Sequence, residues 1–152
     1  MQAAGYGRII FTSSNVGAFG LPWQTNYAAA KAGLLGYAMW WRPRVLPMAS
    51  AANAILPQAL NTSMQNPSGR PPYAPKDLEE MAAVIAPFAR FMTVENVAAL
   101  VVYLASRECD LSGQVFSVDS GHVARVFVGV TPGCLRRTRH VRLRRTWLRT
   151  WM

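Results

Sequence analysis

The stretch Asn26-Tyr27-Ala28-Ala29-Ala30-Lys31 decides how this sequence folds and what it can do. Alanine is the strongest helix former, so the stretch predicts a helix over residues 27–39, with its opening asparagine as the N-cap. Tyr27 and Lys31 are four residues apart and therefore share one helix face. Ser14 lies thirteen residues before Tyr27, at the end of an apolar run. A hydroxyl, a phenol and an ammonium brought together predict a proton-transfer site, because an ammonium favours the ionised form of a nearby phenol.

Three short apolar runs predict strands, at residues 8–14, 54–57 and 114–118. The other expected elements are a loop over 15–26, a loop over 58–75, a helix over 77–91, and a helix from an N-cap at Thr93 through Ala105. The last helix carries a stripe of apolar residues at helical spacing, which indicates a face buried in a core. Strands that alternate with helices at this spacing predict an α/β fold with a parallel sheet of about three strands and flanking helices.

Length and composition limit the class of protein. A chain of 152 residues with 51% hydrophobic residues is long enough for one globular domain with a sizeable core. It contains no run of 18 apolar residues and no apolar signal sequence at its start, so we expect no membrane span and no signal peptide. Cys109 and Cys134 do not have the spacing of a metal site or a disulfide framework, so we expect no metal and a reducing, cytoplasmic location.

The net charge of +9 is concentrated at the C-terminal end of the chain. Residues 1–126 hold nine Lys and Arg against seven Asp and Glu, whereas residues 127–152 hold seven Arg and no acid. We interpret 131–152 as a basic Arg/Trp tail and predict that it is disordered. The alternative is a module that binds nucleic acid or a membrane surface, because arginines alternate there with Trp147 and Trp151. We expect neither partner.

The ordered set of these motifs resembles the short-chain dehydrogenase/reductase family. The features that carry the resemblance are Thr12-Ser13-Ser14, Tyr27-x-x-x-Lys31, Asn53-Ala54-Ile55-Leu56-Pro57, Thr62 and Gly113–Gly121. The chain is most similar to the branch that reduces 3-oxoacyl thioesters or oxidises (3R)-hydroxyacyl thioesters. The resemblance implies that residues 1–130 form the C-terminal half of a Rossmann-type doubly wound sheet. The glycine-rich dinucleotide fingerprint of the family is absent from the sequence.

The resemblance also implies roles for individual residues. Tyr27 is the general acid/base, Lys31 assists it and binds the nicotinamide ribose, and Ser14 holds the substrate carbonyl. The remaining implied contacts are with the cofactor, from Tyr27, Pro57 and Thr62, and with the substrate, from Ser14, Trp23 and Gln24. The implied cofactor is NAD or NADP, and the implied partner is a small-molecule substrate. The 27–39 helix is apolar nearly all round, so we expect it to be buried on more than one side and to form an interface in a homo-oligomer.

The sequence departs from the family pattern at two places. Gln58 stands where the family usually has glycine, and residues 40–51 do not resemble the family. We hypothesise a pair of compensating frame changes in the gene around residues 40–51 and a further one near Cys134, which resequencing tests. The expected function is therefore an NAD(P)-dependent oxidoreductase that transfers hydride to or from a hydroxy/oxo group. The alternative is an inactive truncated or frame-shifted fragment of such an enzyme.

Overall fold

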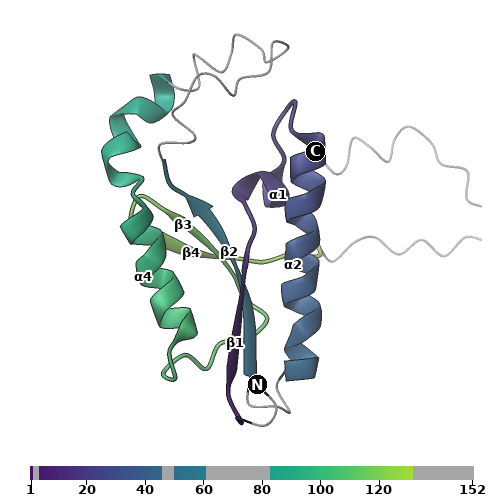
Figure 1. Ribbon diagram of the computed structural model, residues 1–152. Coiled ribbons are helices and arrows are strands. Elements are labelled where there is room, and N and C mark those ends of the chain that lie inside the picture. Colours follow the sequence, from purple (N-terminus) through teal and green to yellow (C-terminus); the bar gives the residue numbers. More distant parts are fainter. Residues whose placement is uncertain (2–3, 46–49, 61–82, 132–152) are drawn as a thin grey trace, which may run out of the picture.

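The computed structural model describes residues 1, 4–45, 50–60 and 83–131, with only the backbone of 42–45. Its elements in chain order are β1 (Gly7–Thr12), α1 (Asn15–Phe19), α2 (Thr25–Val45), β2 (Ser50–Gln58), the 3-10 helix η3 (Ala86–Phe91), α4 (Val94–Ala105), β3 (Val115–Asp119) and β4 (His122–Val126). These elements form one sheet with helices on both faces (Figure 1).

The sheet has the strand order β1-β2-β3-β4. The first three strands are parallel, and β4 pairs with β3 in the antiparallel direction. The predicted α/β fold with a parallel sheet is thus confirmed, with a fourth strand that we did not predict. A two-residue turn joins β3 to β4, and its residues Ser120 and Gly121 have φ values of 51° and 81°. Tight hairpin turns require such positive φ values, so these two residues carried the missed signal.

The helices α2 and α4 cover opposite faces of the sheet (Figure 1). Successive residues of β2 point to opposite faces, so Ala54 and Leu56 pack in the cluster under α2 while Ile55 packs in the cluster under α4. All residues from Ser50 to Leu56 are buried. Burial on both faces is characteristic of a central strand in a parallel sheet, and it gives this molecule two core layers with β2 between them.

The bounds of three expected elements were wrong. The helix α2 begins at Thr25 and runs to Val45, past the expected end at residue 39, so Asn26 lies inside it and is not its N-cap. No glycine or proline stands at residues 39–42 to end the helix there. Within the expected loop over 15–26, residues Asn15–Phe19 form α1. β2 begins at Ser50 because its small first residues pair with β1, and tertiary pairing overrides their weak strand propensity.

The two helices expected in the C-terminal half can be compared with the helices that the structure describes. α4 spans Val94–Ala105 with Thr93 at the N-cap position, as predicted, although the Thr93 side chain makes no capping hydrogen bond. The expected buried stripe, which included Val94 and Val102, was partly wrong: these two side chains are 50% and 69% exposed. The face that packs on the sheet is centred on Leu100 and Leu104 instead. Of the helix expected over 77–91, the structure describes residues 83–91, where η3 occupies Ala86–Phe91. The rest of that helix, most of the loop over 58–75, and the tail from residue 132 lie outside the described residues.

Candidate membrane spans were sought in the described ranges only. No single helix there is both long enough and apolar enough to cross a bilayer. One sharply bent pair of helices, Ala83–Phe91 with Val94–Ala105, meets the criteria together by length and composition alone.

Candidate active site

The predicted site residues that the structure describes come from the carboxyl end of the sheet. Ser14 follows the end of β1, Pro57 is the penultimate residue of β2, and Tyr27 lies in the first turn of α2. The ends of β1 and β2 and the start of α2 lie at the same end of the molecule (Figure 1). Ligands of open α/β sheets bind at this edge, so the topology gathers these residues where chemistry is expected.

Ser14 caps the short helix α1. Its Oγ accepts a hydrogen bond from the Val16 backbone N–H at 3.2 Å. The bond uses one acceptor position of the hydroxyl, so the proton of Ser14 remains available for donation. Ser14 is half-buried just after the carboxyl end of β1, so part of its surface is exposed to solvent.

Tyr27 and Lys31 lie side by side on α2. The Lys31 Nζ is 5.7 Å from the centroid of the Tyr27 ring, and it donates a hydrogen bond of 2.9 Å to the Thr12 carbonyl. Tyr27 is 43% exposed, so a ligand can reach its phenol. A phenol with an ammonium beside it can donate a proton to a developing alkoxide or accept one from an alcohol.

The backbone of Lys31 is held by residues that follow β1. The buried Ser13 donates a hydrogen bond of 2.6 Å from its Oγ to the Lys31 carbonyl. A Cβ added to Gly17 would lie 2.8 Å from both the carbonyl carbon and the Cβ of Lys31, so α1 approaches α2 more closely than any side chain permits. The sequence carried no signal for these contacts; we assigned the catalytic serine to Ser14 and gave Ser13 no role.

A chain of polar side chains joins the carboxyl ends of three strands. Asn15 Nδ2 donates to Gln58 Oε1 at 3.0 Å, and Ser117 Oγ donates to Asn15 Oδ1 at 3.2 Å. Gln58, which departs from the family pattern, therefore has a defined partner next to Ser14. Sequence reasoning missed this chain because its members are far apart in the sequence. Pro57, beside Gln58, is half-buried and pairs with Val118 of β3.

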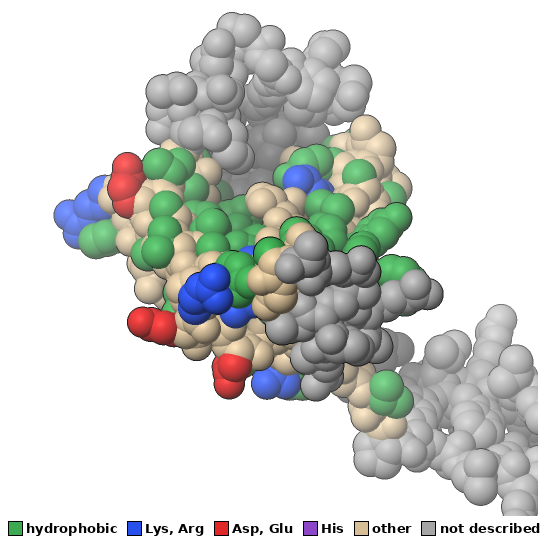
Figure 2. Space-filling model, turned by 60° about the horizontal axis from the view of Figure 1, so that its bottom comes forward, with side chains coloured by type: hydrophobic (Ala, Val, Ile, Leu, Met, Phe, Trp, Pro, Cys, Tyr) green, Lys and Arg blue, Asp and Glu red, His purple; other side chains and the backbone are tan. Residues whose placement is uncertain are grey.

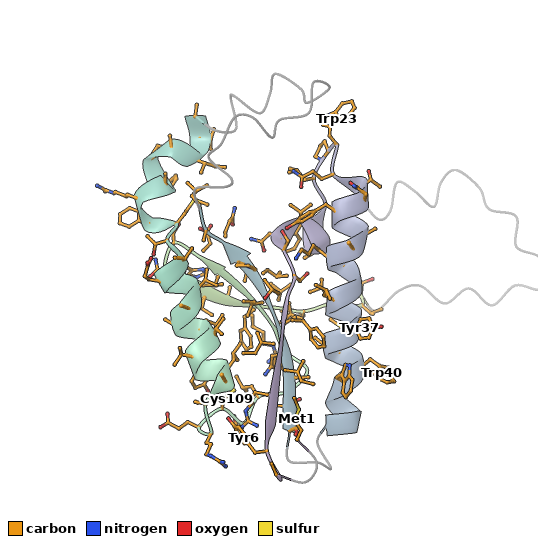
Figure 3. The ribbon with its side chains drawn as sticks, viewed as in Figure 1. Met1, Tyr6, Trp23, Tyr37, Trp40 and Cys109 are labelled. Carbon is orange, nitrogen blue, oxygen red and sulfur yellow. The ribbon has the colours of Figure 1, made fainter. Side chains whose placement is uncertain are left out.

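The two residues expected to border the substrate lie in the turn between α1 and α2. Trp23 has a φ of 68°, is 67% exposed, and points away from the sheet (Figure 3). A positive φ is strained for a bulky residue. Gln24 is half-buried, and its carbonyl accepts a hydrogen bond from the Ala28 amide. Thr62 lies outside the described residues. The structure thus brings Tyr27 and Lys31 together and directs Trp23 elsewhere.

Comparison with known proteins identifies similar chains. The profile of a family described as enoyl-(acyl carrier protein) reductase matches residues 1–122. The chain is 36% identical over 118 residues to the 3-oxoacyl-(acyl-carrier-protein) reductase FabG of Thermotoga maritima, covering 77% of this chain and 46% of that protein. It is 33% identical over 122 residues to the 3-oxoacyl-(acyl-carrier-protein) reductase MabA of Mycobacterium bovis, covering 80% and 47%. The chain spans about half the length of these curated relatives.

Solved structures show the same architecture. A short chain dehydrogenase from Mycobacterium avium superposes with a TM-score of 0.64 at 28% identity, covering 93% of this chain and 40% of that one. The peroxisomal multifunctional enzyme type 2 from Drosophila melanogaster superposes with a TM-score of 0.69 at 24% identity, covering 99% of this chain and 24% of that one. The second likeness concerns the fold alone.

Proposed function

Because this chain belongs to the short-chain dehydrogenase/reductase family, we propose that it supplies the acid/base residues of an NAD(P)-dependent oxidoreductase. The observation that carries the proposal is the adjacency of the Lys31 ammonium and the Tyr27 ring at the carboxyl edge of a parallel sheet. The reaction is hydride transfer between NAD(P) and a hydroxy/oxo group. We place it in the cytoplasm, in keeping with the cysteine pattern.

Each residue has one role in the direction of reduction. The Tyr27 hydroxyl gives its proton to the substrate oxygen as that oxygen gains negative charge. The Lys31 ammonium stabilises the phenolate that Tyr27 becomes. The Ser14 hydroxyl donates a hydrogen bond to the same oxygen and so stabilises its charge. A bound reduced nicotinamide would supply the hydride.

The residues present fit one end of such a cofactor. Lys31 carries a donor at the surface near the strand ends, where a ribose hydroxyl of the nicotinamide half could accept its hydrogen bond. Pro57 would flank the nicotinamide ring. The pyrophosphate of a dinucleotide is normally held by a glycine-rich turn after a strand. Here β1 is followed by Ser13, Ser14 and α1 and not by a glycine-rich turn. We therefore assign binding of the pyrophosphate to residues outside this sequence.

The names of the relatives support the substrate class that we propose. FabG and MabA are both named as 3-oxoacyl-(acyl-carrier-protein) reductases. We therefore assign an acyl thioester as the substrate, with the carbonyl at its third carbon lying between Ser14 and Tyr27. The first compound to test is a short 3-oxoacyl thioester with either reduced cofactor.

A second candidate is a polypeptide that does not catalyse the reaction alone. The specific observation is that the chain spans about half the length of the curated relatives and that β1 lies at one edge of the described sheet. An edge strand leaves a row of backbone groups without a neighbouring strand. In this case the acid/base residues act only after a cofactor-binding half is added.

Cofactor binding separates the two candidates. NADH and NADPH are titrated into the 152-residue chain, and into a fusion of this chain with the half of the T. maritima FabG that it does not match. Binding and thioester reduction by the chain alone support the first candidate. Binding by the fusion only, up to millimolar cofactor, supports the second. A fusion that binds the cofactor but reduces no 3-oxoacyl thioester contradicts the assigned substrate.

We also propose that α2 forms the interface of a homo-oligomer. Only one side of α2 packs on the sheet, through Leu35 and Ala38. Its other side has a hollow of about 420 Å³ lined by Gly33, Gly36, Tyr37 and Trp40. Figure 3 shows Trp40 on the side of α2 that faces away from the sheet, where it is 52% exposed. Tyr37 is 58% exposed, although its ring also lies 6.1 Å from that of Phe11 in β1.

The occupant that we propose for this hollow is α2 of a second copy. A Cβ added to Gly33 or Gly36 would meet nothing within 4 Å, so another helix can approach the backbone there. A two-fold axis across α2 would place the aromatic rings of each copy over the glycines of the other. Such a contact would cover a cluster of large apolar side chains that is costly to leave in water.

Tyr37→Glu is expected to reduce the oligomer to a smaller species, because the carboxylate would be buried without a partner. The control is Val102→Glu, which places the same charge on the exposed face of α4, where Val102 is 69% exposed. Sedimentation analysis of both variants measures the oligomeric state. Dissociation by Val102→Glu alone, or a monomeric parent chain, would refute an interface at α2.

Basic residues in the described part of the chain give no support to a nucleic-acid surface on the face that Figure 2 presents. There, Lys and Arg side chains stand in separate places and alternate with acidic ones. The basic tail lies outside the described residues, so its disorder remains a prediction. A steep dependence of DNA affinity on salt, lost on deleting residues 134–152, would be required to assign it a partner.

A further inference from the structure

We propose that Ser13 is a positioning residue, which holds Lys31 in a fixed place relative to Ser14. The inference rests on the proposed function for the importance of Lys31, but its geometry is independent of it. Ser13 is 2% exposed and lies between the end of β1 and the serine that caps α1.

Three contacts from one short segment hold Lys31. The Ser13 hydroxyl donates to the Lys31 carbonyl at 2.6 Å, and the Thr12 carbonyl accepts from the Lys31 Nζ at 2.9 Å. Gly17 closes the third side, where an added Cβ would lie 2.8 Å from the Lys31 Cβ. The main chain and the end of the side chain of Lys31 are therefore both tied to residues 12–17.

The hydrogen bond from Ser13 is not needed to give the Lys31 carbonyl a partner. Lys31 lies inside α2, where its carbonyl can accept the amide hydrogen bond of the following turn. Burying a serine hydroxyl is costly unless it finds a partner, and an alanine would avoid that cost. What the hydroxyl adds is a fixed distance between the strand end and α2 at the residue that carries the ammonium.

The consequence is a rigid link between two proposed catalytic residues. Ser14 follows Ser13 directly, whereas Lys31 is 18 residues from Ser13. With the tie in place, a displacement of the strand end moves the Ser14 hydroxyl and the Lys31 backbone together. Without it, the Lys31 ammonium loses its fixed approach to the Thr12 carbonyl, although Ser13 itself never touches substrate.

The small number of lysines in the chain allows a direct measurement of the contact between Lys31 and Thr12. It contains only two lysines, Lys31 and Lys76. Limited acetylation followed by peptide mass spectrometry gives the ratio of their labelling rates in the full-length chain. A lysine whose Nζ donates a hydrogen bond reacts slowly, because that hydrogen bond must break before the nitrogen can attack the reagent. The ratio therefore reports the contact between Lys31 and Thr12 without any need for activity.

Ser13→Ala is expected to raise the rate of Lys31 relative to Lys76 by roughly 2- to 10-fold, the range that the net contribution of one hydrogen bond implies. The matched control is Ser112→Ala. Ser112 is also buried, and its Oγ accepts from the amide of Ala52, which pairs with Ile9, whereas the Lys31 Nζ bonds the Thr12 carbonyl at the carboxyl end of β1. Its loss is therefore expected to lower stability without a direct effect on Lys31. An unchanged ratio in Ser13→Ala, or an equal rise in Ser112→Ala, would overturn the proposal.

A measurement on the parent chain covers the case in which Ser13→Ala does not fold. Lys31 is expected to acetylate several times more slowly in buffer than in urea, with both rates normalised to a lysine peptide added to the same tube. Equal normalised rates would overturn the proposal. Thioester reduction is assayed separately in the fusion that binds cofactor. If that fusion reduces no thioester while Lys31 is still acetylated slowly, the proposed function is wrong and the positioning role of Ser13 stands.

Discussion

Tyr27→Phe is expected to lower the rate of hydride transfer by about 10²- to 10⁴-fold, which is the usual contribution of a positioned general acid. The change removes one hydroxyl and keeps the ring that lies beside Lys31. Since Tyr27 is 43% exposed, its loss of one oxygen should leave the melting temperature nearly unchanged. Thioester-dependent oxidation of reduced cofactor, followed at 340 nm in whichever form of the protein binds cofactor, gives the rate.

Tyr37→Phe is the matched control for this change. Tyr37 lies on the same helix and is 58% exposed, and its ring packs 6.1 Å from that of Phe11. Removal of its hydroxyl should leave the rate within about twofold, because the proton donor is untouched. If Tyr27→Phe retained a rate comparable to that of Tyr37→Phe, the general-acid role of Tyr27 would be wrong.

Asn53→Ala is expected to cost about 2–4 kcal/mol of unfolding free energy, because it leaves two part-buried backbone groups without partners. Asn53 is 1% exposed in the middle of β2. Its Nδ2 donates to the Leu111 carbonyl at 2.8 Å, and its Oδ1 accepts from the Gln114 amide at 3.0 Å. The side chain thus closes the segment that leads into β3. The melting temperature should fall by about 5–15 °C, as measured by circular dichroism.

The control for this prediction is another asparagine with a single backbone contact. Asn96 Nδ2 donates to the Phe91 carbonyl near the surface, so Asn96→Ala should cost about 1 kcal/mol or less. The comparison removes the effect of the residue type. Equal losses of stability in the two variants would show that the buried bridge of Asn53 does not hold β2 to the segment before β3.

Some elements could be predicted from the sequence and others could not, for physical reasons. The position of α4 was predicted, because an N-cap residue followed by apolar residues at helical spacing is a local signal. Its buried face was not fully predicted, because α4 is apolar on more than one side and Val102 is exposed. The start of β2 was missed because Ser50 and the alanines after it have little strand propensity and become a strand only by pairing with β1. The hairpin to β4 depended on Ser120 and Gly121, which we interpreted only as part of the family motif Gly113–Gly121.

The same distinction applies to the candidate site. The adjacency of Tyr27 and Lys31 follows from helical spacing, so the sequence sufficed to predict it. The hydrogen bond from Ser13 to Lys31 depends on how α2 packs against the sheet, which no local pattern encodes. Gln58 was interpreted only as a departure from the family, whereas the structure pairs it with Asn15. α2 continues through residues 40–45, which neither supports nor opposes the frame-change hypothesis. Resequencing the gene tests that hypothesis.

The most direct test of the acid/base site is the transfer of deuterium from the nicotinamide C4 of a labelled reduced cofactor to a 3-oxoacyl thioester. The fusion with the unmatched half of the T. maritima FabG is assayed with Tyr27 and with Tyr27→Phe. We predict one deuterium at the third carbon of the hydroxyacyl product with Tyr27 and a 10²-fold or greater loss of its rate of formation with phenylalanine, about the contribution of a general acid. Equal rates with both residues, or no labelled product from a fusion that binds the cofactor, would contradict the account.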